Sequence, residues 1–167
     1  MGRISEKGSR SIAMDYYKKT VKLDENFYPA HEKIGYLEFG NNNFEKAIPS
    51  LKKVVNNSQN VMGHLLLGLS YEKIDSLDQA YTQLSVASNL GDIRILEDLS
   101  RIEKKRGNLK NALEIVTSLI DIYKEPNYYN LRGNIHVDMG NLSLACINFK
   151  IASLLNNNFD LVDEFCD

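Results

Sequence analysis

The sequence predicts an all-α fold built from stacked antiparallel helix pairs, an α-solenoid. The first observation behind this prediction is a set of alanines at intervals of 33, 32 and 33 residues, namely Ala47, Ala80, Ala112 and Ala145. The second is a small residue twelve positions before each alanine, namely Gly35, Gly68, Ser100 and Gly133. The third is that no segment shows the β-branched alternation of a strand. A period of this length is typical of repeat architectures, in which each unit stacks on its neighbours.

The repeat period divides the chain into segments. Residues 1–11 are polar and contain Gly and Ser, and we expect a flexible leader or a cloning scar there. A half-repeat at 12–27 follows, which corresponds only to the second helix of a unit. We then expect four full repeats and the start of a further helix, at 28–60, 61–92, 93–125, 126–159 and 160–167. The array therefore begins and ends within a repeat, which indicates either capping half-units or a chain cut from a longer array.

Each full repeat is expected to contain two helices joined by a turn. In the repeat at 61–92, "VMGHLLLGLSYEKI" is a mainly apolar helix and "LDQAYTQLSVASNL" is a second helix with one apolar face. The residue that opens each second helix is a good N-cap type, whose side-chain oxygen can accept from the first-turn N–H groups. These residues are Asn43, Ser76, Asn108 and Asn141. The Gly and Ala anchors let the two helix axes approach to about 8–10 Å, whereas Pro49 should cost its helix one backbone hydrogen bond.

Composition excludes several classes of protein. A formal net charge of −2 and a pI near 5.9 argue against a general nucleic-acid binder. No apolar run approaches the roughly 20 residues that span a bilayer. Cys146 and Cys166 show no disulfide-framework or zinc-site spacing, so we expect two free, mostly buried thiols in a reducing compartment, with the cytoplasm as the default location.

The repeat resembles the tetratricopeptide repeat (TPR). The segments that carry the resemblance are "IGYLEFGNNNFEKAIPSLKKV", "LLLGLSYEKIDSLDQAYTQLSVA" and "RGNIHVDMGNLSLACINFKIA". Each places a large residue, Gly, a turn and Ala as the family pattern does. The chain departs from the pattern where His31, His64, Leu96 and Tyr129 replace the family's tryptophan, and where Ser100 replaces Gly. The resemblance implies about four full repeats, with half-repeats at each end, that form a right-handed superhelix and a single TPR domain over 12–167.

The resemblance also implies a peptide-binding concave groove lined by the first helix of each repeat. The expected groove residues change from apolar-aromatic, through basic, to amide-rich along the chain. They are Tyr36, Phe39, Met62, Leu65, Leu69, Lys73, Arg94, Arg101, Lys104, Lys105, Asn127, Asn130 and Asn134. This gradient suggests a partner segment with an apolar anchor followed by acidic residues. Two alternatives stay open: Tyr36 and Phe39 as core residues, and "RIEKKR" (101–106) as an ordinary solvated helix end.

Neither catalytic nor metal-binding chemistry is indicated. The three histidines fall in three different repeats, too far apart to share a metal ion, and no phosphate-binding, nucleophile or zinc-protease motif is present. The groove is also not the carboxylate clamp of TPR proteins that bind chaperone tails. Glu32 and Asp98 stand where that clamp needs a cation or an amide.

We therefore expect a non-enzymatic protein-interaction scaffold or adaptor that has no cofactor or metal and binds no nucleic acid. The alternatives are a small TPR secretion-type chaperone that holds an exported client, and the regulatory TPR arm of a larger protein with a catalytic domain. Self-association through the open array ends or the tail "DLVDEFCD" (160–167) is a further possibility. Fold alone does not choose among these functions.

Overall fold

The computed structural model of the chain describes residues 2–91, 93–156 and 166. Within these residues it contains nine α-helices and no strand, so the all-α prediction is confirmed. The backbone contacts separate the chain into two compact units, Met1–Asp92 and Ile93–Asp167. We describe each unit by itself.

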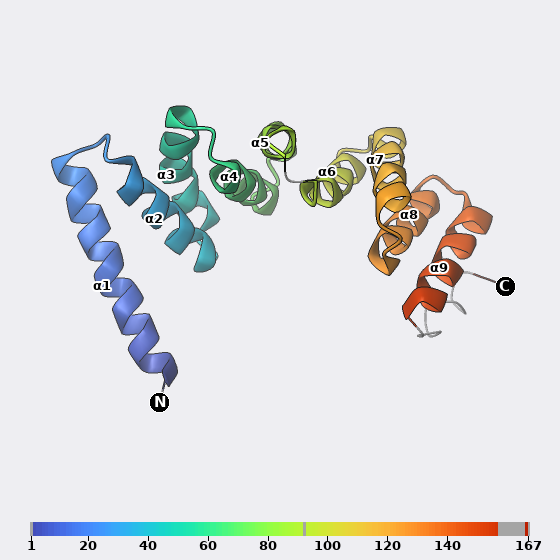
Figure 1. The fold of residues 1–167 in the computed structure, drawn as a ribbon, viewed down its shortest axis with the longest axis horizontal. Helices are drawn as coiled ribbons and strands as arrows, with labels where there is room; N and C mark the ends of the chain where they lie inside the picture. Colours follow the sequence, from blue (N-terminus) through green and yellow to red (C-terminus); the bar gives the residue numbers. More distant parts are fainter. Residues whose placement is uncertain (1, 92, 157–165, 167) are drawn as a thin grey trace. The chain divides into compact units, whose positions relative to one another are not determined.

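Unit 1 holds five helices and unit 2 holds four (Figure 1). Those of unit 1 are α1 (Gly2–Leu23), α2 (Tyr28–Gly40), α3 (Phe44–Asn57), α4 (Val61–Lys73) and α5 (Leu77–Asn89). Those of unit 2 are α6 (Ile95–Lys105), α7 (Leu109–Ile122), α8 (Pro126–Asp138) and α9 (Leu142–Asn156). Each even-numbered helix packs against the helix that follows it, and α3 and α7 also pack against the next pair. We call α2, α4, α6 and α8 the A helices, and α3, α5, α7 and α9 the B helices.

The Gly and Ala anchors mark the closest approach of each A–B pair. All four repeat alanines have no exposed surface. A Cβ atom on Gly68 would lie 2.7 Å from Cγ of Leu84, and a Cβ on Gly133 would lie 2.5 Å from Cε1 of Phe149. Real Cβ atoms do not come so close to a neighbour. Glycine is therefore required at these positions for space, and its conformational freedom is not the reason.

In the third repeat, different residues form the closest contact between the paired helices. Ser100 takes the Gly position, is fully buried, and donates from Oγ to the carbonyl oxygen of Ala112 across the helix pair at 2.9 Å. The facing B-helix position, four residues after the anchor alanine, holds Val116. The other repeats place Leu or Phe there. The smaller side chain opposite Ser100 gives space for its hydroxymethyl group.

The four turns between paired helices share one geometry. The residue before each B-helix N-cap has a left-handed φ of 59–80°, namely Asn42, Asp75, Gly107 and Gly140. The next residue donates its backbone N–H to the carbonyl five positions earlier, as from Asn43 to Glu38 at 2.9 Å and from Asn108 to Glu103 at 2.9 Å. This geometry explains the repeated Gly-Asn-Leu at 107–109 and 140–142: glycine allows the left-handed φ, and leucine starts the B helix.

The N-cap residues lie where the sequence predicts, but the capping hydrogen bonds predicted for three of them are wrong. Neither Asn43, Ser76 nor Asn108 accepts from the first turn of its helix. At Asn43 the side-chain amide instead donates to Oε2 of Glu38 at 2.8 Å. The carboxylate of Glu38 is buried on the preceding helix, so it competes successfully for this side chain.

The two ends of the chain also differ from expectation in some respects. Residues 2–11, expected as a leader, belong to α1, which packs against α2. Cys146 on α9 forms a disulfide with Cys166, with the Cα atoms 5.2 Å apart, so the prediction of two free thiols is wrong. A sequence separation of 20 residues gave no sign of this pairing. The expected helix start at 160–167 lies outside the described residues except at Cys166.

Pro49 lies inside α3 as predicted, on the exposed side of that helix. No helix in the described residues is long and apolar enough to cross a membrane.

Candidate functional site

A hydrogen-bonded cluster joins the A helices of unit 1. Oη of Tyr36 donates to Oε1 of Glu32 at 2.9 Å, and Nδ2 of Asn60 donates to the same oxygen at 3.3 Å. Oδ1 of Asn60 accepts from the backbone N–H of Gly63 at 2.8 Å and so caps α4. Partial burial, followed by the hydrogen bond to Glu32 and its negative charge, raises the pKa of Tyr36 to about 12. The phenol is therefore neutral and fixed in direction at physiological pH.

Apolar side chains line the A-helix surface of α4 beside this cluster. Met62 is 49% exposed, and Leu65 and Leu69 are half-buried, whereas Leu67 points into the core with 1% exposure. Lys73 is exposed at the end of the same helix. This helix therefore has apolar surface in addition to its core face.

The two aromatic residues of α2 that the sequence assigns to the groove lie at the surface of the core. Tyr36 and Phe39 are both half-buried. The ring of Phe39 packs edge-on against Phe44, with the ring centroids 5.4 Å apart. Phe39 is therefore held by the turn between α2 and α3, while the hydroxyl of Tyr36 is held by the polar cluster.

A pocket of about 430 Å³ lies between α1 and α2 and contains Tyr36. It is lined mainly by apolar surface, with Tyr17 and Ala13 contributed by α1 and Lys33 by α2. The groove residues expected from the sequence do not include any from α1, because the resemblance assigns binding to first helices only. Here the half-repeat supplies one wall of a pocket next to the first A helix.

The basic residues of unit 2 are balanced by acids. Arg101 forms an ion pair with Asp98 one turn earlier, and Nζ of Lys104 lies 2.7 Å from Oδ2 of Asp138. Arg94 and Lys105 are exposed on the same helix region. An acidic ligand would therefore compete with Asp98 for Arg101 and with Asp138 for Lys104. Asn127 and Asn134 on α8 are exposed and Asn130 is half-buried.

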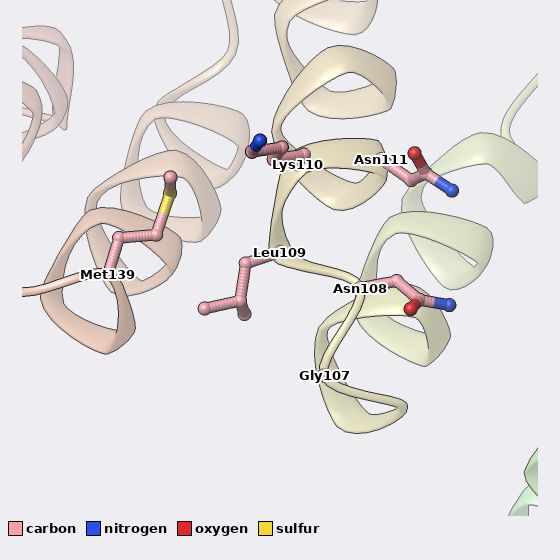
Figure 2. Close-up of a pocket in the computed structure, with 6 residues that line it drawn as sticks. All are labelled: Gly107, Asn108, Leu109, Lys110, Asn111 and Met139. Carbon is pink, nitrogen blue, oxygen red and sulfur yellow. The ribbon is translucent and has the colours of Figure 1, made fainter.

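A second pocket, of about 550 Å³, lies at the start of α7 (Figure 2). The turn before α7 and its first residues line one side, and Met139 of the α8–α9 turn lines the other. None of the predicted groove residues belongs to it. It is a surface hollow between two turns, and nothing else in the described residues marks it as a binding site.

Each of the first two histidines links its A helix to the paired B helix. Nδ1 of His31 lies 3.5 Å from Oγ of Ser50, and Nδ1 of His64 lies 2.9 Å from Oε1 of Gln83. Both partners stand 19 residues later in the chain. His136 is buried on α8, and burial followed by the nearby Arg132 charge lowers its pKa. No group of three His, Cys, Asp or Glu residues in the described ranges is placed to hold a metal ion.

Known structures with this arrangement of helices are TPR proteins. The crystal structure of MamA aligns with a TM-score of 0.82 at 24% sequence identity, over 93% of this chain and 93% of that chain. The structure of YrrB, a TPR protein with an unusual peptide-binding site, aligns with a TM-score of 0.85 at 17% identity, over 96% of this chain and 85% of that chain. The chain has the TPR fold.

A thermophilic TPR protein of Thermus thermophilus aligns less closely, with a TM-score of 0.62 at 14% identity over 93% of this chain and 87% of that one. No protein-family model matches the sequence, and no curated protein matches it significantly.

Proposed function

We propose that the chain is a non-catalytic adaptor that binds a peptide segment along the A-helix surface of unit 1. The observation that carries the proposal is the exposed apolar surface of α4, formed by Met62, Leu65 and Leu69. Full burial of an exposed Leu or Met side chain contributes about 1.5–3 kcal/mol, and these three partly exposed side chains would each contribute a fraction of that. Three such side chains on one helix face can anchor the apolar residues of a partner.

The polar cluster next to this surface would set the direction of the bound segment. Glu32 keeps acceptor capacity after its two hydrogen bonds, because a carboxylate has about four lone-pair sites. A backbone N–H of the partner is a suitable donor for it. The exposed ammonium groups of Lys33 and Lys73 favour acidic residues in the flanks of the segment.

The test compares three purified proteins as baits in lysate of the source organism. They are the wild type, a Leu65→Glu/Leu69→Glu variant, and a control with Gln79→Glu/Thr82→Glu on the exposed face of α5. Both variants add the same charge, so non-specific electrostatic effects cancel. Circular dichroism establishes that all three are folded.

We expect a protein that the wild type and the control retain and the α4 variant loses. A synthetic segment of that protein should then bind the wild type in fluorescence anisotropy and bind the α4 variant at least tenfold more weakly, a difference of about 1.4 kcal/mol. Equal retention by all three would place the binding surface elsewhere and refute the proposal.

A further inference from the structure

Helix α9 has an apolar stripe on the side that faces away from α8. The stripe consists of Leu144, Ile147, Ile151 and Leu154. Leu144, Ile147 and Leu154 are 47%, 52% and 64% exposed, and Ile151 is half-buried. With Leu142 and Leu155, this helix of 15 residues holds five of the 13 large exposed hydrophobic residues in the described chain. Such a concentration of apolar surface indicates a contact site.

The other B helices do not have this stripe. The repeat register aligns its four positions with twelve residues on α3, α5 and α7, all of them exposed. These are Lys46, Pro49, Lys53 and Asn56; Gln79, Thr82, Val86 and Asn89; and Asn111, Glu114, Ser118 and Asp121. Val86 is the only aliphatic residue among the twelve. The stripe therefore is not a requirement of the repeat, because the other three repeats fold with polar residues at all of these positions except Pro49 and Val86.

The stripe is also not the surface by which α9 belongs to unit 2. Packing against α8 uses the opposite face, where Ala145, Phe149 and Ala152 are buried. Helix α9 is thus apolar on two opposite sides, and only one of them is covered by the described residues. Lys150 is the one charged side chain on the helix, so the surface offers little to a highly charged partner.

We propose that the stripe pairs with the same stripe of a second copy of this chain, in antiparallel orientation. The spacing of the four residues is three, four, three, which is the a–d–a–d pattern of a helix-to-helix seam. Both the spacing and the order Leu, Ile, Ile, Leu read the same in either direction. Antiparallel pairing therefore sets Leu144 against Leu154 of the second copy, and Ile147 against Ile151 of the second copy.

This reversibility is what a two-fold symmetric interface requires, since each residue must contact its counterpart in both directions. A staggered arrangement would leave part of the stripe uncovered. A parallel pair would set each residue against its own counterpart, and mixing two charged variants distinguishes it from the antiparallel pair. Lys150 lies at the edge of the seam and can extend its ammonium group to water. A helix of 15 residues is about 22 Å long, so the contact is small and the dimer should be weak, with a dissociation constant in the micromolar range.

The first experiment is sedimentation velocity without reductant, which keeps the Cys146–Cys166 disulfide on α9 formed. A non-reducing gel identifies any disulfide-linked species. The wild type should change from the 19.0 kDa of one chain towards twice that mass as the protein concentration rises from about 1 μM to about 1 mM. The single variants Ile147→Glu and Ile151→Lys should each raise the dissociation constant more than about tenfold. The control Thr82→Glu/Val86→Lys, at the corresponding positions of α5, should dimerise like the wild type.

The second experiment mixes the two single variants. In the antiparallel pair, Glu at 147 of one copy meets Lys at 151 of the other, while the remaining two isoleucines still meet. We expect the mixture to dimerise more strongly than either variant alone. In a parallel pair each introduced charge would face an isoleucine, so the mixture would dimerise no more strongly than either variant alone.

Several outcomes would overturn the proposal. One is a wild type that stays at the mass of one chain over the whole range. Another is a chain that ends at Asn156 and dimerises where the full chain does not, which would make the chain's own last residues the occupant of the stripe. A third is a wild type that remains a single chain but binds phospholipid vesicles, with binding lost in Ile147→Glu, which would make the stripe a membrane contact.

Discussion

Two substitutions should convert the Gly68–Leu84 contact of the second repeat into the Ser100–Val116 contact of the third repeat. A Cβ on Gly68 would lie 2.7 Å from Cγ and 2.9 Å from Cδ2 of Leu84. The atom in the way is the branch point of a fully buried leucine, which can move aside only if the side chain changes its χ1 rotamer within the packed core. Overpacking of a tight core costs about 1–3 kcal/mol, whereas replacing Gly by Ser inside a helix recovers only about 0.5 kcal/mol of propensity. The steric term wins, and Gly68→Ser should lower the free energy of unfolding by about 1–2 kcal/mol.

The second substitution, Leu84→Val, removes the clashing branch and by itself should cost about 1 kcal/mol through lost packing. The double variant Gly68→Ser/Leu84→Val reproduces the Ser100–Val116 pair of the third repeat. There the serine hydroxyl donates to a B-helix carbonyl at 2.9 Å. The same bond becomes available from residue 68 to the carbonyl of Ala80, which already lies 3.2 Å from the built Cβ. The double variant should be more stable than the sum of the single losses by about 1 kcal/mol or more.

The assay is urea unfolding followed by circular dichroism for the four proteins of the cycle. A matched control is Gly40→Ala, because Gly40 lies at the end of α2 with no atom near its Cβ direction. That change should be neutral or stabilising by up to about 1 kcal/mol. Additive losses within about 0.5 kcal/mol would refute the reasoning, since they would show that Ser and Val are not matched to each other. A Gly40→Ala loss equal to that of Gly68→Ser would refute the steric explanation.

Three further predictions follow from single residues. In alkaline titration monitored by ultraviolet absorbance, the Tyr36→Phe variant should lack a tyrosine that ionises near pH 12. Glu32→Gln should lower the pKa of Tyr36 towards 10. Because the pKa of Tyr36 is higher in the folded than in the unfolded chain, its contribution to stability is lost as pH rises through this range. The pKa of His136 is below its ordinary 6.5 in the fold, so its contribution is lost as pH falls below 6.5, and His136→Gln should flatten the unfolding free energy against pH there. Gly107 has φ of +80°, so Gly107→Ala should lower the midpoint of urea unfolding by an amount equivalent to about 1–2 kcal/mol.

The repeat register made most of the fold predictable. The four anchor alanines have no exposed surface, and glycine is sterically required opposite Leu51, Leu84 and Phe149. Small residues at fixed intervals predict close helix packing, because a close contact between two helices requires small side chains. The four repeats give four independent instances of the same pattern. The N-cap positions were predicted for the same reason. Their hydrogen bonds were not, since the partner that takes the side chain of Asn43 is a buried carboxylate on another helix.

Features that depend on contacts between repeats were harder to find. The pairing of Lys104 with Asp138 joins α6 and α8, so the sequence alone shows an excess of cations where the fold has a balanced pair. The pocket between α1 and α2 was missed because α1 has no partner helix in its own repeat. The disulfide between Cys146 and Cys166 has no spacing signature at all.

Departures from the register carry more information about function than the register itself. The positions equivalent to Ile147 hold Pro49, Thr82 and Glu114 in the other repeats, so folding of the repeat does not explain an exposed isoleucine on α9. Val116, in contrast, is explained by the serine opposite it. The same comparison separates the A-helix residues. His31 and His64 make equivalent hydrogen bonds to their B helices, so the packing of each helix pair explains them. Leu65 occupies the repeat position of Glu32, and no contact within its helix pair explains a leucine there. Residues left over after the packing of each repeat is accounted for are therefore the ones to mutate first.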